Sequence, residues 1–134
     1  MKKEIIYITL CVALCLLISC HSSSMYFDIE QQAIIGCENP ITKLYIISKD
    51  NKDYLYFSIL HPKKGSNKFN IKKLIKDYSI ETTRTCIDLQ DFKLRPETEY
   101  EIINYSNGDA TSGKLLIRTD KNSSVIYADK TSCK

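Results

Sequence analysis

The amino-acid sequence predicts a small all-β domain, either a sandwich or a barrel. Beyond residue 24 the chain consists largely of short runs rich in Ile, Leu, Val, Phe and Tyr, which are residue types that strands favour. Turn-forming residues separate these runs at short intervals, and two of the runs alternate apolar and polar positions. Frequent short strands with turn signals between them are typical of antiparallel sandwiches and barrels.

Each expected strand lies next to a turn signal. Residues 54–60 form the strongest strand segment, because aromatic and aliphatic residues fill it and His61-Pro62 ends it. Residues 49–53, which precede it, have the composition of a turn. The alternation over residues 98–105 places Tyr100 and Ile102 on one face. The other expected strands cover residues 25–30, 33–37, 41–48, 85–89 and 114–119, with further turns at 39–40 and 107–109.

One segment fits two structures. Its apolar residues recur at helical spacing, and they are Ile71, Leu74, Ile75 and Tyr78. Asn70 precedes them and could cap such a helix. A strand over the same residues is the competing interpretation. We therefore expect an all-β domain that includes at most one short helix.

The N-terminus has the form of an export signal. Lys2 and Lys3 precede an apolar run over residues 5–19. This run is shorter than the roughly 20 apolar residues that cross a bilayer. Its end, Leu17-Ile18-Ser19-Cys20, resembles the lipobox of bacterial lipoproteins, in which the chain is cut before the cysteine and the cysteine is acylated.

The lipobox resemblance implies an anchor and a location. Residues 1–19 would be removed as a signal peptide, residues 20–26 would hold the lipidated Cys20 and a tether, and residues 27–134 would form one β-sandwich domain. Several acyl chains on one cysteine hold a protein stably at a membrane. By the sorting pattern of enteric lipoproteins, His21 after the cysteine implies the periplasmic side of the outer membrane, with surface display as the alternative.

Three further cysteines remain in the processed chain. An exported compartment is oxidising, so we expect disulfide pairing rather than metal binding. The absence of CxxC spacing and of a histidine cluster also argues against zinc. Three thiols allow three different single bridges, and the sequence does not choose among Cys37, Cys86 and Cys133.

The charges are segregated along the chain, although the net charge is only +3. Lysines gather within residues 63–76, and acidic residues dominate residues 77–101. Two ordinary solvated surfaces would explain this pattern. The functional interpretation is instead a face that steers a charged partner. Nucleic acid is not expected, because the location is wrong and Phe69 alone interrupts the basic stretch. The candidate partner-binding residues are Lys63, Lys64, Lys72 and Lys73, and the acidic side over residues 88–101 is the alternative surface.

The most specific internal motif is Leu94-Arg95-Pro96-Glu97-Thr98-Glu99-Tyr100. It resembles the L-x-P-x-T-x-Y motif of fibronectin type III domains. The resemblance implies a fibronectin- or immunoglobulin-like sandwich, with Leu94 in the core and Pro96 in a turn. Tyr100 would form a tyrosine corner, its hydroxyl bonded to backbone upstream. Thr119 also suits that pattern, whereas the Trp usual in the first sheet is missing. Such a motif argues for a fold and not for an activity.

A wider pattern resembles small enteric lipoproteins described as type VI secretion immunity proteins. It combines Cys20, a short strand at Cys37, a strand over 41–48, the segment 85–89 with Cys86, and a strand over 100–105. The resemblance implies that Cys37 and Cys86 lie on neighbouring strands and form the disulfide. It also implies a stoichiometric inhibitor that binds an incoming toxin in the periplasm.

Few residues suit catalysis. The two histidines are His21, in the tether, and His61, before Pro62. The four glycines are too widely spaced for a phosphate-binding loop, and no positioned acid–base pair is evident. We expect no enzyme, cofactor or metal. Toxin immunity is the first hypothesis, and the alternatives are inhibition of a cell-wall hydrolase such as lysozyme, or a structural or assembly role in the envelope.

Overall fold

The computed structural model describes residues 23–61, 63–73, 76–82, 93–106 and 112–133. Within these ranges the chain is all β, with nine strands and no helix. This confirms the predicted fold class. The strands are β1 (Met25–Asp28), β2 (Ala33–Gly36), β3 (Lys43–Ser48), β4 (Tyr54–Ile59), β5 (Lys68–Asn70), β6 (Tyr78–Thr82), β7 (Glu99–Asn104), β8 (Gly113–Thr119) and β9 (Val125–Ala128).

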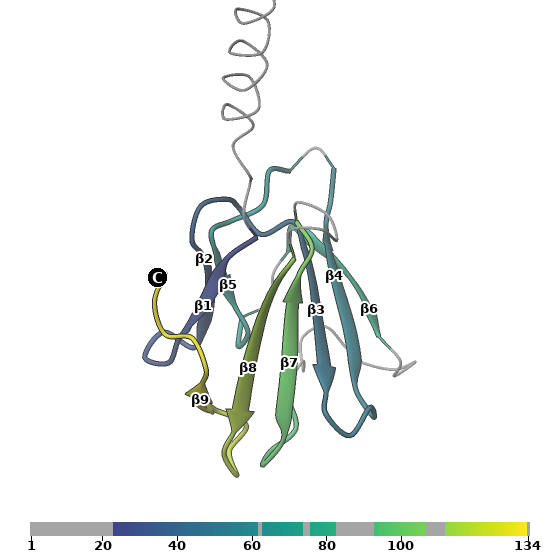
Figure 1. The fold of residues 1–134 in the computed structure, drawn as a ribbon. Coiled ribbons are helices and arrows are strands. Elements are labelled where there is room, and N and C mark those ends of the chain that lie inside the picture. The colour runs from purple at the N-terminus through teal and green to yellow at the C-terminus, as the bar shows by residue number, and fades with distance from the viewer. Residues whose placement is uncertain (1–22, 62, 74–75, 83–92, 107–111, 134) are drawn as a thin grey trace, which may run out of the picture.

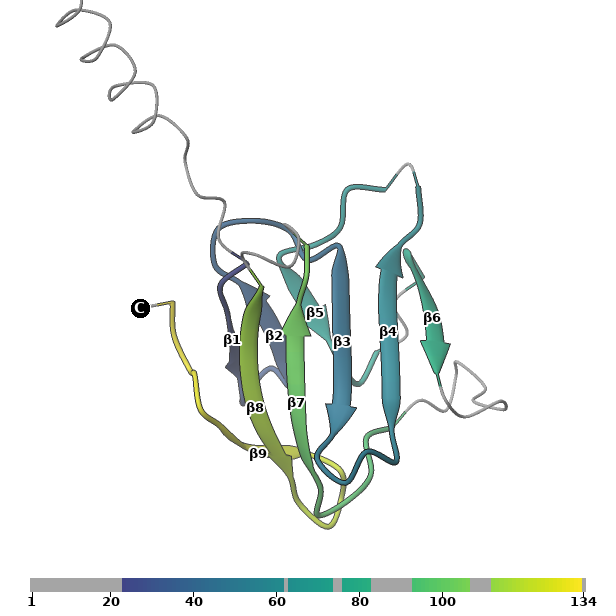
Figure 2. The ribbon, with the colours of Figure 1, turned by 45° about the vertical axis from the view of Figure 1, so that its right-hand side comes forward.

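The strands form two antiparallel sheets that pack as a sandwich (Figures 1 and 2). The small sheet has the order β1-β2-β5, and the large sheet has the order β6-β4-β3-β7-β8-β9. The order β1-β2-β5 opposite β4-β3-β7-β8 is that of a fibronectin-like sandwich. Strands β6 and β9 each add one strand to an edge of the large sheet.

The core lies between the sheets, on the side chains that alternate inward. In β3, Leu44 and Ile46 are fully buried, and Ile46 pairs with Leu55 of β4 and Ile102 of β7. Each such aliphatic side chain contributes about 1.5–3 kcal/mol by leaving water. The small sheet contributes the other half of the core through residues that include Phe27, Ile34 and Phe69.

The tyrosine corner is present. The backbone N–H of Arg95 donates to the Tyr100 hydroxyl at 2.8 Å, and Tyr100 is 1% exposed. Leu94 is buried beside it, as the motif predicts. The Thr119 hydroxyl, at the end of β8, donates to the carbonyl of Arg95 at 2.7 Å. Burial raises the pKa of Tyr100 to about 12, partly opposed by the bond from Arg95.

In the segment that fitted two structures, the described residues form no helix, and Leu74 and Ile75 lie outside the described residues. Residues 71–73 and 76–77 form turns, and a strand begins at Tyr78, so the helical interpretation is wrong for these residues. The reason is packing: the Phe69 ring lies edge-on to Phe57 at 4.9 Å and to Tyr78 at 5.4 Å. Phe69 and Tyr78 each lie on a strand, and the extended backbone of these two strands places their rings together. The sequence also did not predict β9.

The disulfide joins Cys37 to Cys133, with their Cα atoms 5.6 Å apart. The expected Cys37–Cys86 bridge is therefore wrong, since Cys37 forms one disulfide only. The neighbours of β2 in its sheet are β1 and β5, and neither strand carries a cysteine. Cys86 and the strand expected over residues 85–89 lie outside the described residues, as does the turn expected at 107–109.

The C-terminal segment links the two sheets before it reaches the disulfide (Figure 2). The N–H of Asp129 donates to the carbonyl of Leu116 in β8 at 3.0 Å. The N–H of Phe27 in β1 donates to the carbonyl of Lys130, also at 3.0 Å. Strand β1 therefore has β2 on one side and the C-terminal segment on the other.

The described chain enters the sandwich beside the start of β8. Ser23 is buried, and the side-chain amide of Asn104 donates to its carbonyl at 3.1 Å. The contact requires glycine at position 113, because a Cβ there would lie 2.2 Å from the Ser23 oxygen. Cys20, the expected lipid site, lies outside the described residues.

Candidate functional site: a tyrosine-rich sheet face

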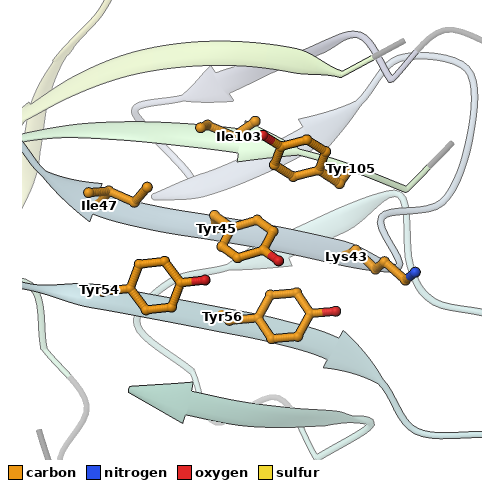
Figure 3. A pocket seen from close by; sticks show the side chains of 7 residues that line it. All are labelled: Lys43, Tyr45, Ile47, Tyr54, Tyr56, Ile103 and Tyr105. Carbon is orange, nitrogen blue, oxygen red and sulfur yellow. The ribbon is translucent and has the colours of Figure 1, made fainter. Parts of the chain in front are cut away.

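The outer face of the large sheet carries a cluster of tyrosines around a shallow depression of about 420 Å³ (Figure 3). We call this surface the tyrosine face. It comes from β3, β4 and β7 and from the residue that follows β7. Its lining consists of Lys43, Tyr45, Ile47, Tyr54, Tyr56, Ile103 and Tyr105.

Strand alternation and register explain this cluster. Successive side chains of a strand point to opposite faces, so Tyr45 points outward between the buried Leu44 and Ile46. Tyr45 pairs with Tyr56 of β4 on one side and with Ile103 of β7 on the other. Three adjacent strands thus bring side chains distant in sequence onto one surface.

Tyr45 is the centre of the cluster. Its ring stacks on Tyr56 at 4.5 Å and lies edge-on to Tyr105 at 5.1 Å, and the tilted ring of Tyr54 is 5.6 Å away. These spacings are those of favourable aromatic pairs. Burial by these neighbours, helped by a hydrogen bond with Tyr54, raises the pKa of the Tyr45 hydroxyl. Tyr45 therefore stays protonated at physiological pH and can donate a hydrogen bond.

Two ion pairs on this sheet lie around the depression. Lys49 forms an ion pair with Glu99 at 3.2 Å, and Lys114 forms one with Glu101 at 3.4 Å. Lys43 lies at one end of the face, is exposed, and forms no ion pair with any described residue. The lining therefore combines aromatic and aliphatic surface with one available positive charge, and the exposed Glu81 of β6, paired in register with Tyr56, adds a negative charge beside it.

The four lysines predicted from sequence are exposed, but none of them lines the tyrosine face. Lys63 forms an ion pair with Asp77 at 3.6 Å, just before β6. The ammonium group of Lys72 donates to Ser124 at 2.8 Å, just before β9. Lys64 follows Lys63 in sequence, and Lys73 follows Lys72. The contacts of Lys63 and Lys72 therefore place these two lysine pairs on different parts of the surface. The predicted lysine cluster is thus two separate surfaces.

The sequence reasoning missed the tyrosine face. Its signal was present, since tyrosines stand at alternate positions 45, 54 and 56 of two adjacent expected strands. Alternation does not tell which of a strand's two faces meets the core, so it does not reveal that these tyrosines share the outer face.

A second polar cluster has a structural role. Arg95 donates to both carboxylate oxygens of Asp50, at 2.7 and 2.8 Å, and to Asp53. The Arg95 guanidinium holds the pKa of Asp50 well below its ordinary value, with help from the Ser48 hydroxyl. The cluster fastens the β3–β4 turn to the segment before β7. Within the described ranges, no three His, Cys, Asp or Glu side chains gather as metal ligands would.

Comparisons with protein-family models, curated proteins and solved structures find no match to this chain. Among the residues that the structure describes, none belongs to a helix of the length and apolarity needed to cross a membrane.

Proposed function

We propose that this protein is a non-catalytic binding module that neutralises a secreted protein toxin. It would act in the periplasm, anchored to the outer membrane by lipid on Cys20, as an immunity protein of the type VI secretion kind. The observation that carries the binding role is the tyrosine face, where four tyrosines meet on one side of a rigid sheet.

Tyrosine suits a protein interface for physical reasons. A tyrosine ring offers a large apolar area and a hydroxyl, and it loses little conformational entropy on binding. Tyrosine is accordingly enriched at interfaces and among the residues that contribute most to affinity. Here the rings also pack on one another, so the surface is largely organised before a partner arrives.

The expected anchor is compatible with this surface. The chain enters beside Ser23, at the end of the sandwich where β8 begins, whereas the tyrosine face lies on the side of the sandwich, along the strands (Figures 1 and 3). A protein anchored through Cys20 would therefore keep the tyrosine face accessible beside the membrane surface.

The test is a co-purification from the strain that produces the protein. The full chain, with an affinity tag after Lys134, is expressed during contact-dependent growth with secretion active, and captured proteins are identified by mass spectrometry. We expect one secreted effector to be recovered with wild type and lost with the double variant Tyr45→Ser/Tyr56→Ser.

Tyr127→Ser is the matched control, since Tyr127 is 44% exposed on β9 and outside the tyrosine face. Recovery of a lysozyme or of envelope-assembly proteins instead would refute toxin immunity. Equal recovery of the effector by all three proteins would refute the tyrosine face as the binding surface.

A further inference from the structure

Lys43 differs from the other lysines on its side of the large sheet. Lys49 and Lys114 are each paired with a glutamate, whereas Lys43 has no ion-pair partner among the described residues. No carboxylate belongs to the lining of the depression, so nothing in the lining neutralises Lys43. A partner with a negative charge at this position would be attracted, and one with a positive charge repelled.

The tyrosine hydroxyls add to this polarity. In Figure 3, the hydroxyls of Tyr45, Tyr54 and Tyr56 all point toward the end of the face where Lys43 lies. A tyrosine hydroxyl donates one hydrogen bond, and an ionised carboxylate only accepts. The Lys43 end thus offers donors and a cation, while Ile47 and Ile103 supply apolar surface farther along.

We propose that the tyrosine face binds an acidic side chain of its protein partner, presented on a segment with apolar neighbours. The carboxylate would lie at Lys43 and the tyrosine hydroxyls, and the apolar neighbours would pack on the Tyr45 ring and the two isoleucines. A depression of about 420 Å³ is within the range that holds a small ligand, so it accommodates a few side chains of such a segment. The inference rests on the proposed function and adds the chemistry of the partner.

A random peptide library tests this directly, without knowledge of the partner. The full chain in detergent is immobilised and used to select from a phage-displayed library of twelve-residue peptides. We expect the recovered peptides to be enriched in Asp or Glu next to aliphatic or aromatic residues. Their recovery should fall about tenfold or more on Lys43→Glu, because attraction becomes repulsion.

Lys49→Glu is the matched control, because it makes the same change of charge beyond the opposite end of β3. It should leave the recovery of these peptides near the wild-type level. Peptides without acidic enrichment, no enrichment of any peptide, or equal loss on Lys43→Glu and Lys49→Glu would each overturn the inference.

The two proposals fail separately. If the co-purification recovers an effector but the selected peptides are not acidic, the partner chemistry is wrong and the immunity proposal stands. If the peptides are acidic and depend on Lys43 but no effector is recovered, the site stands and the proposed function is wrong.

Discussion

At the scale of single residues, Tyr100 connects the large sheet to the loop before it. Its hydroxyl accepts from the Arg95 backbone and donates to Asp53 at 3.2 Å. Tyr100→Phe would leave both groups without this partner, so we expect a loss of about 1–2 kcal/mol in the free energy of unfolding at pH 7. Denaturant titration measures it, with Tyr127→Phe as the control on an exposed ring.

The same hydroxyl predicts how stability responds to alkali. Its folded-state pKa of about 12 lies above the ordinary value of 10.0, so the folded protein keeps a proton that the unfolded chain loses. The associated stability is fully present below pH 10 and is lost as the pH rises toward 12. Two pKa units correspond to about 2–3 kcal/mol. Tyr100→Phe should flatten the fall in unfolding free energy over this range, and an unchanged slope would contradict the assignment.

Asp50 has the opposite pH dependence. Its pKa is held below 3.8 by Arg95, so its contribution is present above pH 4 and is lost as the pH falls further. We expect Asp50→Asn to lower the unfolding free energy at pH 7 and to weaken its fall on acidification. Thermal melts between pH 2 and pH 7 measure both effects. Glu30→Gln, at an exposed carboxylate in the β1–β2 turn, is the matched control for the removal of one negative charge.

At the scale of elements, the disulfide holds the C-terminal segment against β1. Its cysteines are 96 residues apart in sequence, and the chain-entropy account gives about 4–5 kcal/mol for closing a loop of that size. We expect Cys133→Ser to lower the unfolding free energy by up to this amount, and reductant to do the same to wild type but not to the variant.

Peptide mapping without reductant checks the pairing itself. A fragment that joins Cys37 to Cys133 is expected from the wild-type protein. A fragment that joins Cys37 to Cys86 would contradict the structure.

The sequence predicted β1, β2, β3, β4, β7 and β8, and the longest of these strands have strong local patterns. Strands β3, β4, β7 and β8 carry continuous or alternating apolar residues over six or seven positions, which local reasoning detects. Strand β5 has only three residues, Lys68–Asn70, and depends on Phe69 packing against rings from β4 and β6. Such a contact depends on tertiary structure, which local sequence patterns do not show. The strand next to β2 was therefore predicted wrongly, and so was the disulfide partner of Cys37.

The candidate site illustrates the same limit. The sequence shows tyrosines at alternate positions of two strands, but their common surface depends on the register of β3 with both β4 and β7. The lysines predicted the site less well, because residues 63–73 include β5 and the lysines before and after this strand lie apart in space. Nearness in sequence overstated their nearness in the fold.

At the scale of the whole molecule, the predicted lysines and the tyrosine face are separate surfaces. We expect reversal of Lys63, Lys64, Lys72 and Lys73 to Glu to slow association with the captured effector. Its dissociation rate should stay near that of wild type, because charges outside the contact act mainly on encounter. Surface plasmon resonance at two salt concentrations measures both rates. A large rise in the dissociation rate would instead place these lysines within the interface.

The enclosure of β1 has a mechanical consequence. A protein held at a membrane by its N-terminus and pulled by a bound partner transmits the load through Ser23 into β1. That strand is bonded laterally to β2 through a strand ladder and to the C-terminal segment through the hydrogen bond from Phe27 to Lys130, so tension along it must shear these bonds together instead of opening one bond at a time. The disulfide holds the C-terminal segment in place while this happens. If the protein is anchored through Cys20 as proposed, the first strand would resist a pull from that anchor through all of these contacts.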